Sequence, residues 1–128
     1  MFVVFVPTEN VERAEKFYGE VMGFKEDLWG FQPPGSEASD VRINPRRVDD
    51  HCGLNFSLFR YEVESNFLSY CEVLISKGVK FKVAGMTPGG YTAIAKDFDG
   101  NQFEIECQNF DEDDDSISPE EWTFYKRY

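Results

Sequence analysis

The chain has 128 residues, which is long enough for one compact domain whose core needs neither disulfide bonds nor a structural metal. Its net charge of −11, with no basic stripe along the sequence, argues against binding to nucleic acid or to an anionic membrane. Three cysteines, Cys52, Cys71 and Cys107, are an odd number without CxxC spacing, so they indicate neither a disulfide framework nor a zinc cluster.

The N-terminal segment favours a cytoplasmic location. It is apolar over the length of one short strand and lacks the charged region and the cleavage site of a signal peptide. No stretch of the sequence is long and apolar enough to span a bilayer. Aromatic residues make up 16% of the chain, which predicts a core or a pocket lined with rings.

The chain begins with a predicted strand and a predicted amphipathic helix. The strand covers residues 1–6 and ends at Pro7. The helix covers residues 9–23, with Asn10 as its N-cap and Gly23 at its end. Its apolar side chains recur at helical spacing: Val11, Ala14, Phe17, Tyr18, Val21 and Met22.

The next thirty residues carry weaker patterns. Residues 24–30 predict a second strand, and residues 31–36 predict a turn. A further strand is expected at residues 37–43, followed by a loop at residues 44–53 with room for one short strand.

From Gly53 the same order of elements begins again. Residues 54–63 predict a long aromatic strand, and residues 65–78 predict a second amphipathic helix. That helix places Phe67, Tyr70, Cys71, Leu74 and Ile75 on one face.

Three more strands complete this second half, the last two joined by a tight turn. They are expected at residues 79–83, 91–97 and 102–108. Residues 98–101, Phe-Asp-Gly-Asn, are typical of a hairpin turn, because Asp-Gly suits positive backbone torsions. The sequence therefore predicts an α+β domain over residues 1–108, built from two similar βαβββ modules at about 1–52 and 53–108.

The tail at residues 109–128 is expected to be an acidic linker followed by a short helix. Ser118, Pro119 and Glu121 fit the start of such a helix. It would carry aromatic side chains that pack on the chain's own domain or on a partner: Trp122, Phe124, Tyr125 and Tyr128.

Two motifs resemble the glyoxalase, bleomycin-resistance and dioxygenase group, the vicinal oxygen chelate superfamily. "VPTENVERAEKFYGEVMGF" is similar to the first-repeat signature of that group, and "KDFDGNQFEIE" is similar to its closing hairpin, with Phe98 where a proline is usual. The resemblance covers about residues 1–108 and implies two modules whose curved sheets enclose a cleft. It also implies a homodimer, because the clefts of such proteins are often completed by pairing between chains.

The resemblance implies a metal site in some members, with ligands on the first and last strands of each module. Carried over to this chain, the last-strand position of the second module is Glu104, which matches. The first-strand positions fall at Val3 and near Phe59, neither of which binds metal. The fourth position falls within residues 37–52, where the carboxylates are Glu37, Asp40, Asp49 and Asp50.

We therefore expect no cofactor, with a divalent metal left as the alternative. Two carboxylates without an imidazole make a poor site for Zn²⁺, Ni²⁺ or Fe²⁺. Glu104 is the one candidate catalytic residue, as a general base if its pKa is raised by burial. The alternative is a carboxylate paired with Arg42, Arg60 or an arginine of a partner.

A ligand pocket is expected in the cleft that the resemblance implies. Strand alternation would place Asn55, Ser57, Phe59 and Tyr61 on one face, which the resemblance assigns to the cleft. In the last strand, Gln102, Glu104 and Glu106 share a face by the same rule. Trp29 and Tyr91 are candidate flat walls, although each ring of this set also fits a simple role in the core.

Two other pairs are weaker candidates. His51 and Cys52 suggest a base and a nucleophile, but adjacent residues in extended chain rarely point at each other. Arg46 and Arg47 fit an exposed loop, with closure over an anionic ligand as the alternative.

Three functions follow, in order of preference. The first is metal-free binding of a small organic ligand, similar to the bleomycin-resistance branch. The second is a metal-dependent lyase, isomerase or dioxygenase of the glyoxalase type. The third is a protein-interaction module that acts through the aromatic tail.

Overall fold

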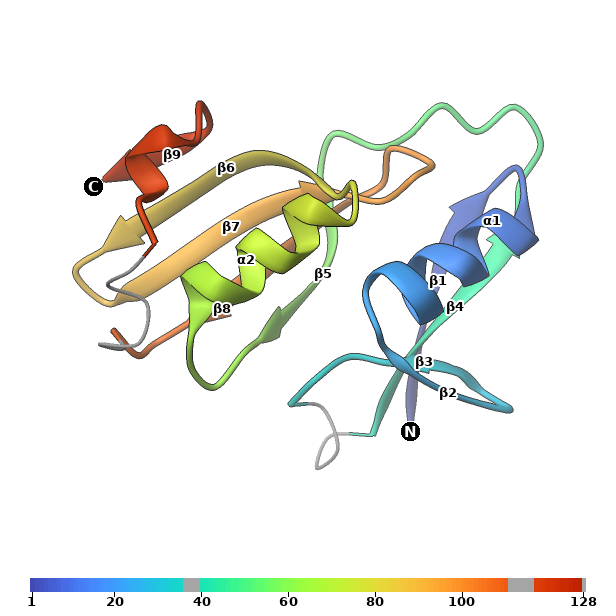
Figure 1. Ribbon diagram of the computed structural model, residues 1–128. Coiled ribbons are helices and arrows are strands. Elements are labelled where there is room, and N and C mark those ends of the chain that lie inside the picture. The colour runs from blue at the N-terminus through green and yellow to red at the C-terminus, as the bar shows by residue number, and fades with distance from the viewer. Residues whose placement is uncertain (36–39, 111–116, 128) are drawn as a thin grey trace.

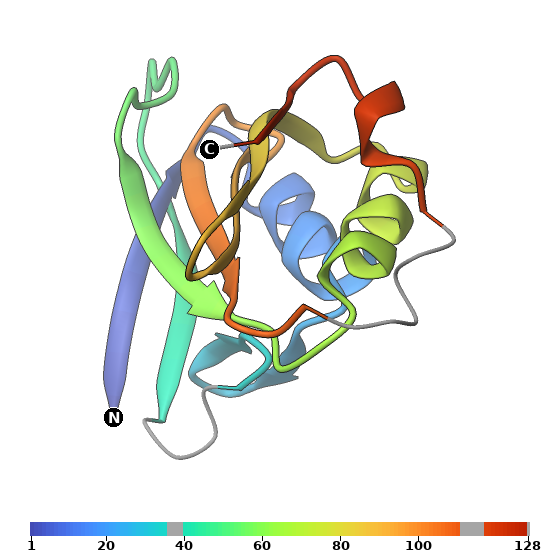
Figure 2. The ribbon, with the colours of Figure 1, turned by 90° about the vertical axis from the view of Figure 1, so that its left-hand side faces the viewer.

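The computed structural model describes residues 1–35, 40–110 and 117–127 of the chain. These residues form two mixed β-sheets, each with helical structure from its own half of the sequence. Figure 1 shows the two modules side by side, and Figure 2 shows both helices on one side of β1, β4 and β5. The predicted α+β fold with two modules is confirmed.

The first module has a four-stranded sheet in the order β1-β4-β3-β2. β1 and β4 pair in parallel, while β3 pairs antiparallel with both β4 and β2. The elements are β1 (Phe2–Thr8), α1 (Val11–Lys16), a π-helical turn (Phe17–Val21), β2 (Lys25–Asp27), β3 (Gly30–Gln32) and β4 (Val41–Arg47).

The first helix begins at the predicted cap. The side chain of Asn10 accepts a hydrogen bond from the backbone N–H of Arg13 at 3.0 Å, which satisfies one free donor of the first turn. At the other end, the N–H of Met22 donates to the carbonyl of Phe17 at 2.8 Å, five residues back. This wider turn places Phe17 and Tyr18 fully inside the core.

The single strand predicted at residues 24–30 is wrong, because the chain reverses direction within it. Leu28 and Trp29 form a turn between β2 and β3, and the carboxylate of Asp27 accepts a hydrogen bond from the N–H of Trp29 at 2.8 Å. The turn that Asp27 stabilises overrides the strand propensity of residues 24–30. Gly30, at φ +130, is required there, because a Cβ would lie 2.5 Å from the carbonyl oxygen of Ile43.

The strand expected at residues 37–43 extends further towards the C-terminus than the sequence predicts. β4 continues through residues 44–47, which the sequence suggested as loop, because this segment pairs in parallel with β1 along its whole length. Residues 36–39, which include the start of the expected strand and Glu37, lie outside the described residues.

The second module has a five-stranded sheet in the order β5-β8-β7-β6-β9. The predicted turn at residues 98–101 joins β7 and β8, and α2 packs Phe67, Cys71 and Leu74 into the core. The elements are β5 (Ser57–Glu62), α2 (Phe67–Ser76), β6 (Lys80–Thr87), β7 (Gly90–Lys96), β8 (Gln102–Cys107) and β9 (Tyr125–Arg127).

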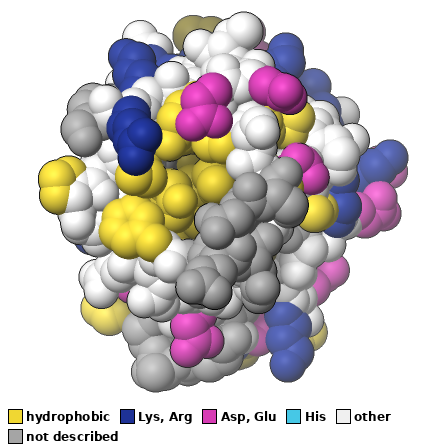
Figure 3. Space-filling model, turned by 60° about the vertical axis from the view of Figure 1, so that its left-hand side comes forward, with side chains coloured by type: hydrophobic (Ala, Val, Ile, Leu, Met, Phe, Trp, Pro, Cys, Tyr) yellow, Lys and Arg dark blue, Asp and Glu magenta, His cyan; other side chains and the backbone are white. Residues whose placement is uncertain are grey.

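The tail is a strand of the second sheet and not the short helix that was expected. Only Pro119–Glu121 form a 3-10 turn, after which β9 pairs in parallel with β6. The aromatic side chains pack on the chain's own domain, with ring centroids 5.6 Å apart for Trp122 and Phe124 and 5.4 Å apart for Phe81 and Phe124. Hydrophobic side chains also gather on the face shown in Figure 3, bordered by charged ones. The expected acidic linker at residues 111–116 and Tyr128 lie outside the described residues.

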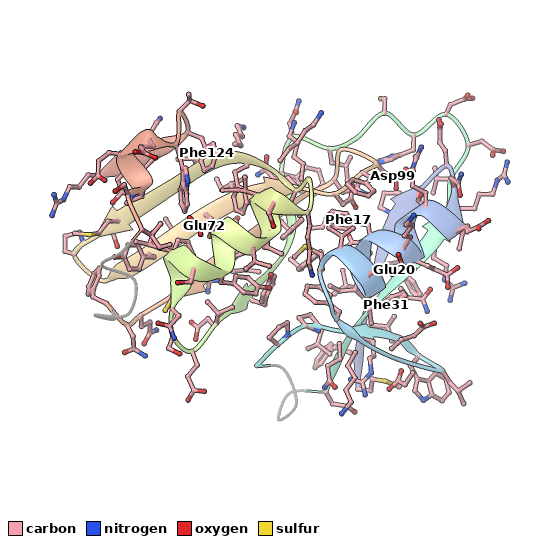
Figure 4. The ribbon with its side chains drawn as sticks, in the orientation of Figure 1. Phe17, Glu20, Phe31, Glu72, Asp99 and Phe124 are labelled. Carbon is pink, nitrogen blue, oxygen red and sulfur yellow. The ribbon has the colours of Figure 1, made fainter. Side chains whose placement is uncertain are left out.

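The two modules contact each other within one chain. Phe17 of the first module lies between the modules in Figure 4 and meets Phe103 of β8 at 6.2 Å between ring centroids. Around it, the hydroxyl of Tyr18 donates to Asp97 at 2.7 Å, and the side-chain amide of Asn101 donates to the carbonyl of Pro7 at 2.7 Å. These two bonds fix the hairpin turn of the second module against the first.

A candidate binding cleft between the modules

A hollow of about 290 Å³ lies where the two modules meet. On one side is the segment that follows β3 together with β4, and on the other side is the edge strand β5. Its lining combines apolar and polar surface: Pro33, Pro34, Gly35, Val41, Ile43, Phe59, Arg60, Tyr61 and Glu62.

A second hollow of about 620 Å³ adjoins the first. The two share Pro34, Gly35 and Glu62, and the second adds Val63, Glu64 and Tyr70. A Cβ on Gly35, whose φ is +76, would lie 3.0 Å from the carbonyl oxygen of Glu62. The backbone of the first module therefore approaches β5 closely at the boundary of the two hollows.

The two aromatic rings that line the cleft, those of Phe59 and Tyr61, pack against other aromatic rings. Phe59 stacks on Phe103 with ring centroids 5.2 Å apart and 5° between the planes. Tyr61 meets Phe24 of the first module edge to face at 5.4 Å. Such packing fixes the ring positions before any ligand binds, which lowers the entropy cost of binding.

A tyrosine pair supplies a partly buried polar group of the cleft. The hydroxyls of Tyr61 and Tyr70 lie 2.6 Å apart. Burial raises the pKa of Tyr61 well above its ordinary value and raises the pKa of Tyr70 to about 12. Both hydroxyls are therefore neutral at physiological pH and able to donate hydrogen bonds.

The expected single face of β5 is wrong, because the strand contains an irregularity. Ser57 lies opposite Gln102, but Arg60 lies opposite Glu104, so β5 has one residue more than β8 over this stretch. The extra residue turns Phe59 and Tyr61 to the face of Phe103. Ser57 and Arg60 stay on the face of Glu104.

The structure brings only two of the predicted pocket residues into the cleft, Phe59 and Tyr61. Ser57 lies on the other face and accepts a hydrogen bond from the side chain of Gln102 at 2.9 Å. Glu104 is half-buried on that same face, opposite Arg60 in β5 and Ile94 in β7. Its catalytic role stays a prediction.

The remaining predicted pocket residues lie elsewhere. Asn55 is exposed before β5 begins, and Trp29 is 56% exposed on the β2–β3 turn. Tyr91 is buried and stacks on Phe67 of α2, with ring centroids 5.0 Å apart. Direct binding through these three stays a prediction, with no contact to the cleft to support it.

Sequence reasoning missed the first module's side of the cleft and Tyr70. Pro33-Pro34 was visible as a turn, and Tyr70 was visible on the apolar face of α2. Neither pattern says which distant strand lies opposite. The tertiary structure supplies that information, because β5 of the second module lies opposite the first module at the cleft.

The other candidate residues have structural partners. The Nε2 atom of His51 lies 2.7 Å from the Oδ1 atom of Asn101, which ties the 48–53 loop to the hairpin turn, while Cys52 is exposed. Arg42 binds Asp27 at 2.8 Å and Asp40 at 3.0 Å, and Arg60 binds Glu106 at 3.3 Å.

The other two candidate arginines, Arg46 and Arg47, also have structural partners. Arg46 lies 4.4 Å above the centre of the Phe5 ring, and Arg47 binds Asp49 at 3.3 Å. Both arginines are exposed at the end of β4, as expected for a surface pair, although within a strand and not a loop.

The side chains near Glu104 do not fit a metal. Its cross-strand neighbours are a guanidinium and an aliphatic side chain, and neither is a ligand for a divalent cation. Within residues 1–35, 40–110 and 117–127, no three His, Cys, Asp or Glu side chains gather as a metal site requires. In the same part of the chain, no helix is long and apolar enough to cross a membrane.

Comparison with solved structures finds the same fold in several proteins. The fosfomycin resistance protein FosX from Listeria monocytogenes is 16% identical with a TM-score of 0.68, over 86% of this chain and 93% of that one. TnmS3, an antibiotic-binding protein from Streptomyces sp. CB03234, is 21% identical with a TM-score of 0.61, over 84% of this chain and 93% of that one. A glyoxalase/dioxygenase from Nostoc punctiforme is 12% identical with a TM-score of 0.66, over 84% and 90%.

At these identities the likeness shows the fold alone, and the chain matches no curated protein. The family assignment comes from a sequence model that matches residues 2–105, most of the chain. The chain belongs to the Glyoxalase/Bleomycin resistance protein/Dioxygenase superfamily.

Proposed function

We propose that this protein binds a small organic molecule in the cleft between its modules, without a metal. The observation that carries the proposal is the cleft itself, two adjoining hollows lined by fixed aromatic rings and a few polar groups. Ligand sites in proteins are concave, mostly apolar and largely formed in advance, with a small number of polar groups that set orientation.

The lining suggests how a ligand would be held. Val41, Ile43 and the rings of Phe59 and Tyr61 offer an apolar surface for a flat or branched hydrocarbon body. Glu62 and Glu64 line the outer part of the cleft and favour a ligand with a positive or neutral charge.

The similar folds of an antibiotic-binding protein and of a fosfomycin resistance protein support this direction. The first is an antibiotic-binding protein and the second is a resistance protein for fosfomycin, a small molecule. They make an antibiotic-like natural product a reasonable first class of ligand to test, although fold alone does not fix function.

A ligand screen by NMR tests the proposal. The ¹⁵N-labelled protein is titrated with a library of antibiotic-like compounds, and backbone amide shifts are followed. We expect binders to shift the amides of Gly35, Arg60 and Glu62, which line the cleft.

A variant that fills the cleft tests the same binding site. Val41→Trp places a large side chain in the first hollow and should weaken binding more than about tenfold, a loss of about 1.4 kcal/mol. Val73→Trp, on the exposed side of α2, is the control and should bind as the wild type does. Equal affinity in both variants, or shifts confined to other regions, would contradict the proposed site.

A further inference from the structure

The tyrosine hydroxyl pair lies where the two hollows meet. Tyr61 comes from β5 and lines the first hollow, while Tyr70 comes from α2 and lines the second. Their hydroxyl oxygens are 2.6 Å apart, so one hydroxyl donates its proton to the other.

One hydroxyl proton of this pair is not used in the hydrogen bond between the two tyrosines. Two neutral hydroxyls carry two protons, and the bond between them uses one. Across the part of the chain that the structure describes, no further hydrogen bond involves either hydroxyl. Since a partly buried donor is costly to leave without an acceptor, the second proton is available for water or for a ligand oxygen in the cleft.

The charges around the pair decide which oxygen suits it. Glu62 and Glu64 line the same hollow as Tyr70, and neither forms an ion pair within residues 1–35, 40–110 and 117–127. The one arginine of the lining, Arg60, is bound to Glu106 at 3.3 Å. Two free carboxylates repel an anionic acceptor and leave a neutral one unaffected.

We propose that the Tyr61–Tyr70 pair donates a hydrogen bond to a neutral carbonyl oxygen of the ligand and selects it over a carboxylate. The inference rests on the proposed function, since it names the polar contact of the same cleft. The raised pKa values of both tyrosines support it, because the pair remains a donor throughout the physiological pH range.

Three compounds with one ring system and one amine separate the possibilities. L-tryptophanamide carries a neutral carbonyl, tryptamine carries none, and L-tryptophan carries a carboxylate. Each is titrated into ¹⁵N-labelled wild-type protein, and affinity is taken from the amide shifts of Gly35, Arg60 and Glu62. We expect tryptophanamide to bind roughly three- to tenfold tighter than tryptamine, the size of one neutral hydrogen bond. We expect tryptophan to be the weakest of the three.

The double variant Tyr61→Phe with Tyr70→Phe removes both hydroxyls and keeps both rings. It should bind tryptophanamide and tryptamine with the same affinity within about twofold, because replacing both partners of a bond by apolar groups leaves no orphaned donor. Tyr125→Phe, in β9 at the opposite edge of the sheet from β5, is the matched control and should keep the wild-type preference.

The possible failures are distinct. Equal affinity of the wild type for tryptophanamide and tryptamine, with shifts in the cleft, would overturn the role of the tyrosine pair and leave the cleft as the binding site. The wild-type comparison needs no variant, so this result stands even if the double variant does not fold. Absence of cleft shifts with all three compounds would overturn the proposed site together with the role of the pair.

Discussion

The two faces of strands β5 and β8 differ in the polarity of their side chains. One face carries Phe59, Tyr61 and Phe103, which stack on one another and face the cleft and the core. The other face carries Arg60, Glu104 and Glu106, which are exposed or half-buried and charged. Glu104, the residue that the family resemblance singles out, lies on the charged face, whereas the cleft is lined from the aromatic one.

This difference teaches that a match to a family position does not by itself place a residue in the lining of the cleft. Glu104 keeps the place of a metal ligand, but its neighbours across the strands are Arg60 and Ile94. On the aromatic face, a shift of one residue in β5 brings Phe59 and Tyr61 to the module boundary. The binding surface that we propose therefore depends on that shift and not on the carboxylate of Glu104.

The largest expected effect is on stability, from removing the ring that both modules share. Phe103 is fully buried and contacts Phe17, Phe59 and Tyr61. Phe103→Ala should lower the free energy of unfolding by about 3–5 kcal/mol, through lost burial and the cavity left behind. Urea denaturation followed by circular dichroism measures it. A loss below about 1 kcal/mol would mean that the modules are not held together through this ring.

A smaller effect is expected on the pH dependence of stability, again on the aromatic face. The pKa of Tyr70 is about 12 in the folded protein because of burial, and its ordinary value of 10.0 applies to the unfolded chain. The folded state therefore holds this proton more tightly, so the stabilisation is complete below pH 10 and is lost as the pH rises towards 12.

The variant Tyr70→Phe measures that contribution. Between pH 9 and pH 11.5, wild-type protein should lose roughly 1–2 kcal/mol more stability than Tyr70→Phe, as urea denaturation at each pH would show. Tyr125→Phe serves as the comparison for general alkaline effects, since Tyr125 is half-buried in β9, at the opposite edge of the sheet from β5. Parallel curves for wild type and Tyr70→Phe would contradict the burial argument.

The smallest effect is expected on the charged face. Glu104→Gln should change the free energy of unfolding by less than about 0.5 kcal/mol, because the side chain is half-buried and beside solvent. It should also leave metal content unchanged after incubation with Ni²⁺, Zn²⁺, Mn²⁺ and Fe²⁺, measured by mass spectrometry of desalted protein. Near-stoichiometric metal in the wild type that disappears in Glu104→Gln would reverse the contrast between the two faces and favour a glyoxalase-type enzyme.

The sequence predicted most of the fold, because local patterns specify it. Asn10 at a helix cap bonds the backbone of its own helix, and Gly100 supplies the positive φ (80) of the hairpin turn, so both roles hold wherever the element packs. The predictions failed where local signals conflicted. Asp27 made a turn inside an apparent strand, and residues 125–127 joined a distant strand, β6, in place of a helix.

The candidate site was less predictable, for a physical reason. Alternation along a strand gives side-chain faces only while the register holds, and the shift between Ser57 and Arg60 reversed them. Phe59 and Tyr61 were identified as pocket residues, and both line the cleft. Tyr70 and Glu62 were not, since nothing local indicates that the hydroxyls of residues 61 and 70 meet.

The sequence by itself determined the two-module α+β fold, the family and the poor ligand set for a metal. These follow from periodicity, turn chemistry and the identity of side chains, which are properties of short segments. Only the tertiary structure decided where the cleft lies, which face of β5 lines it and which hydroxyls pair within it. Those features depend on contacts between segments far apart in the chain, and one extra residue in a strand is enough to exchange its two faces.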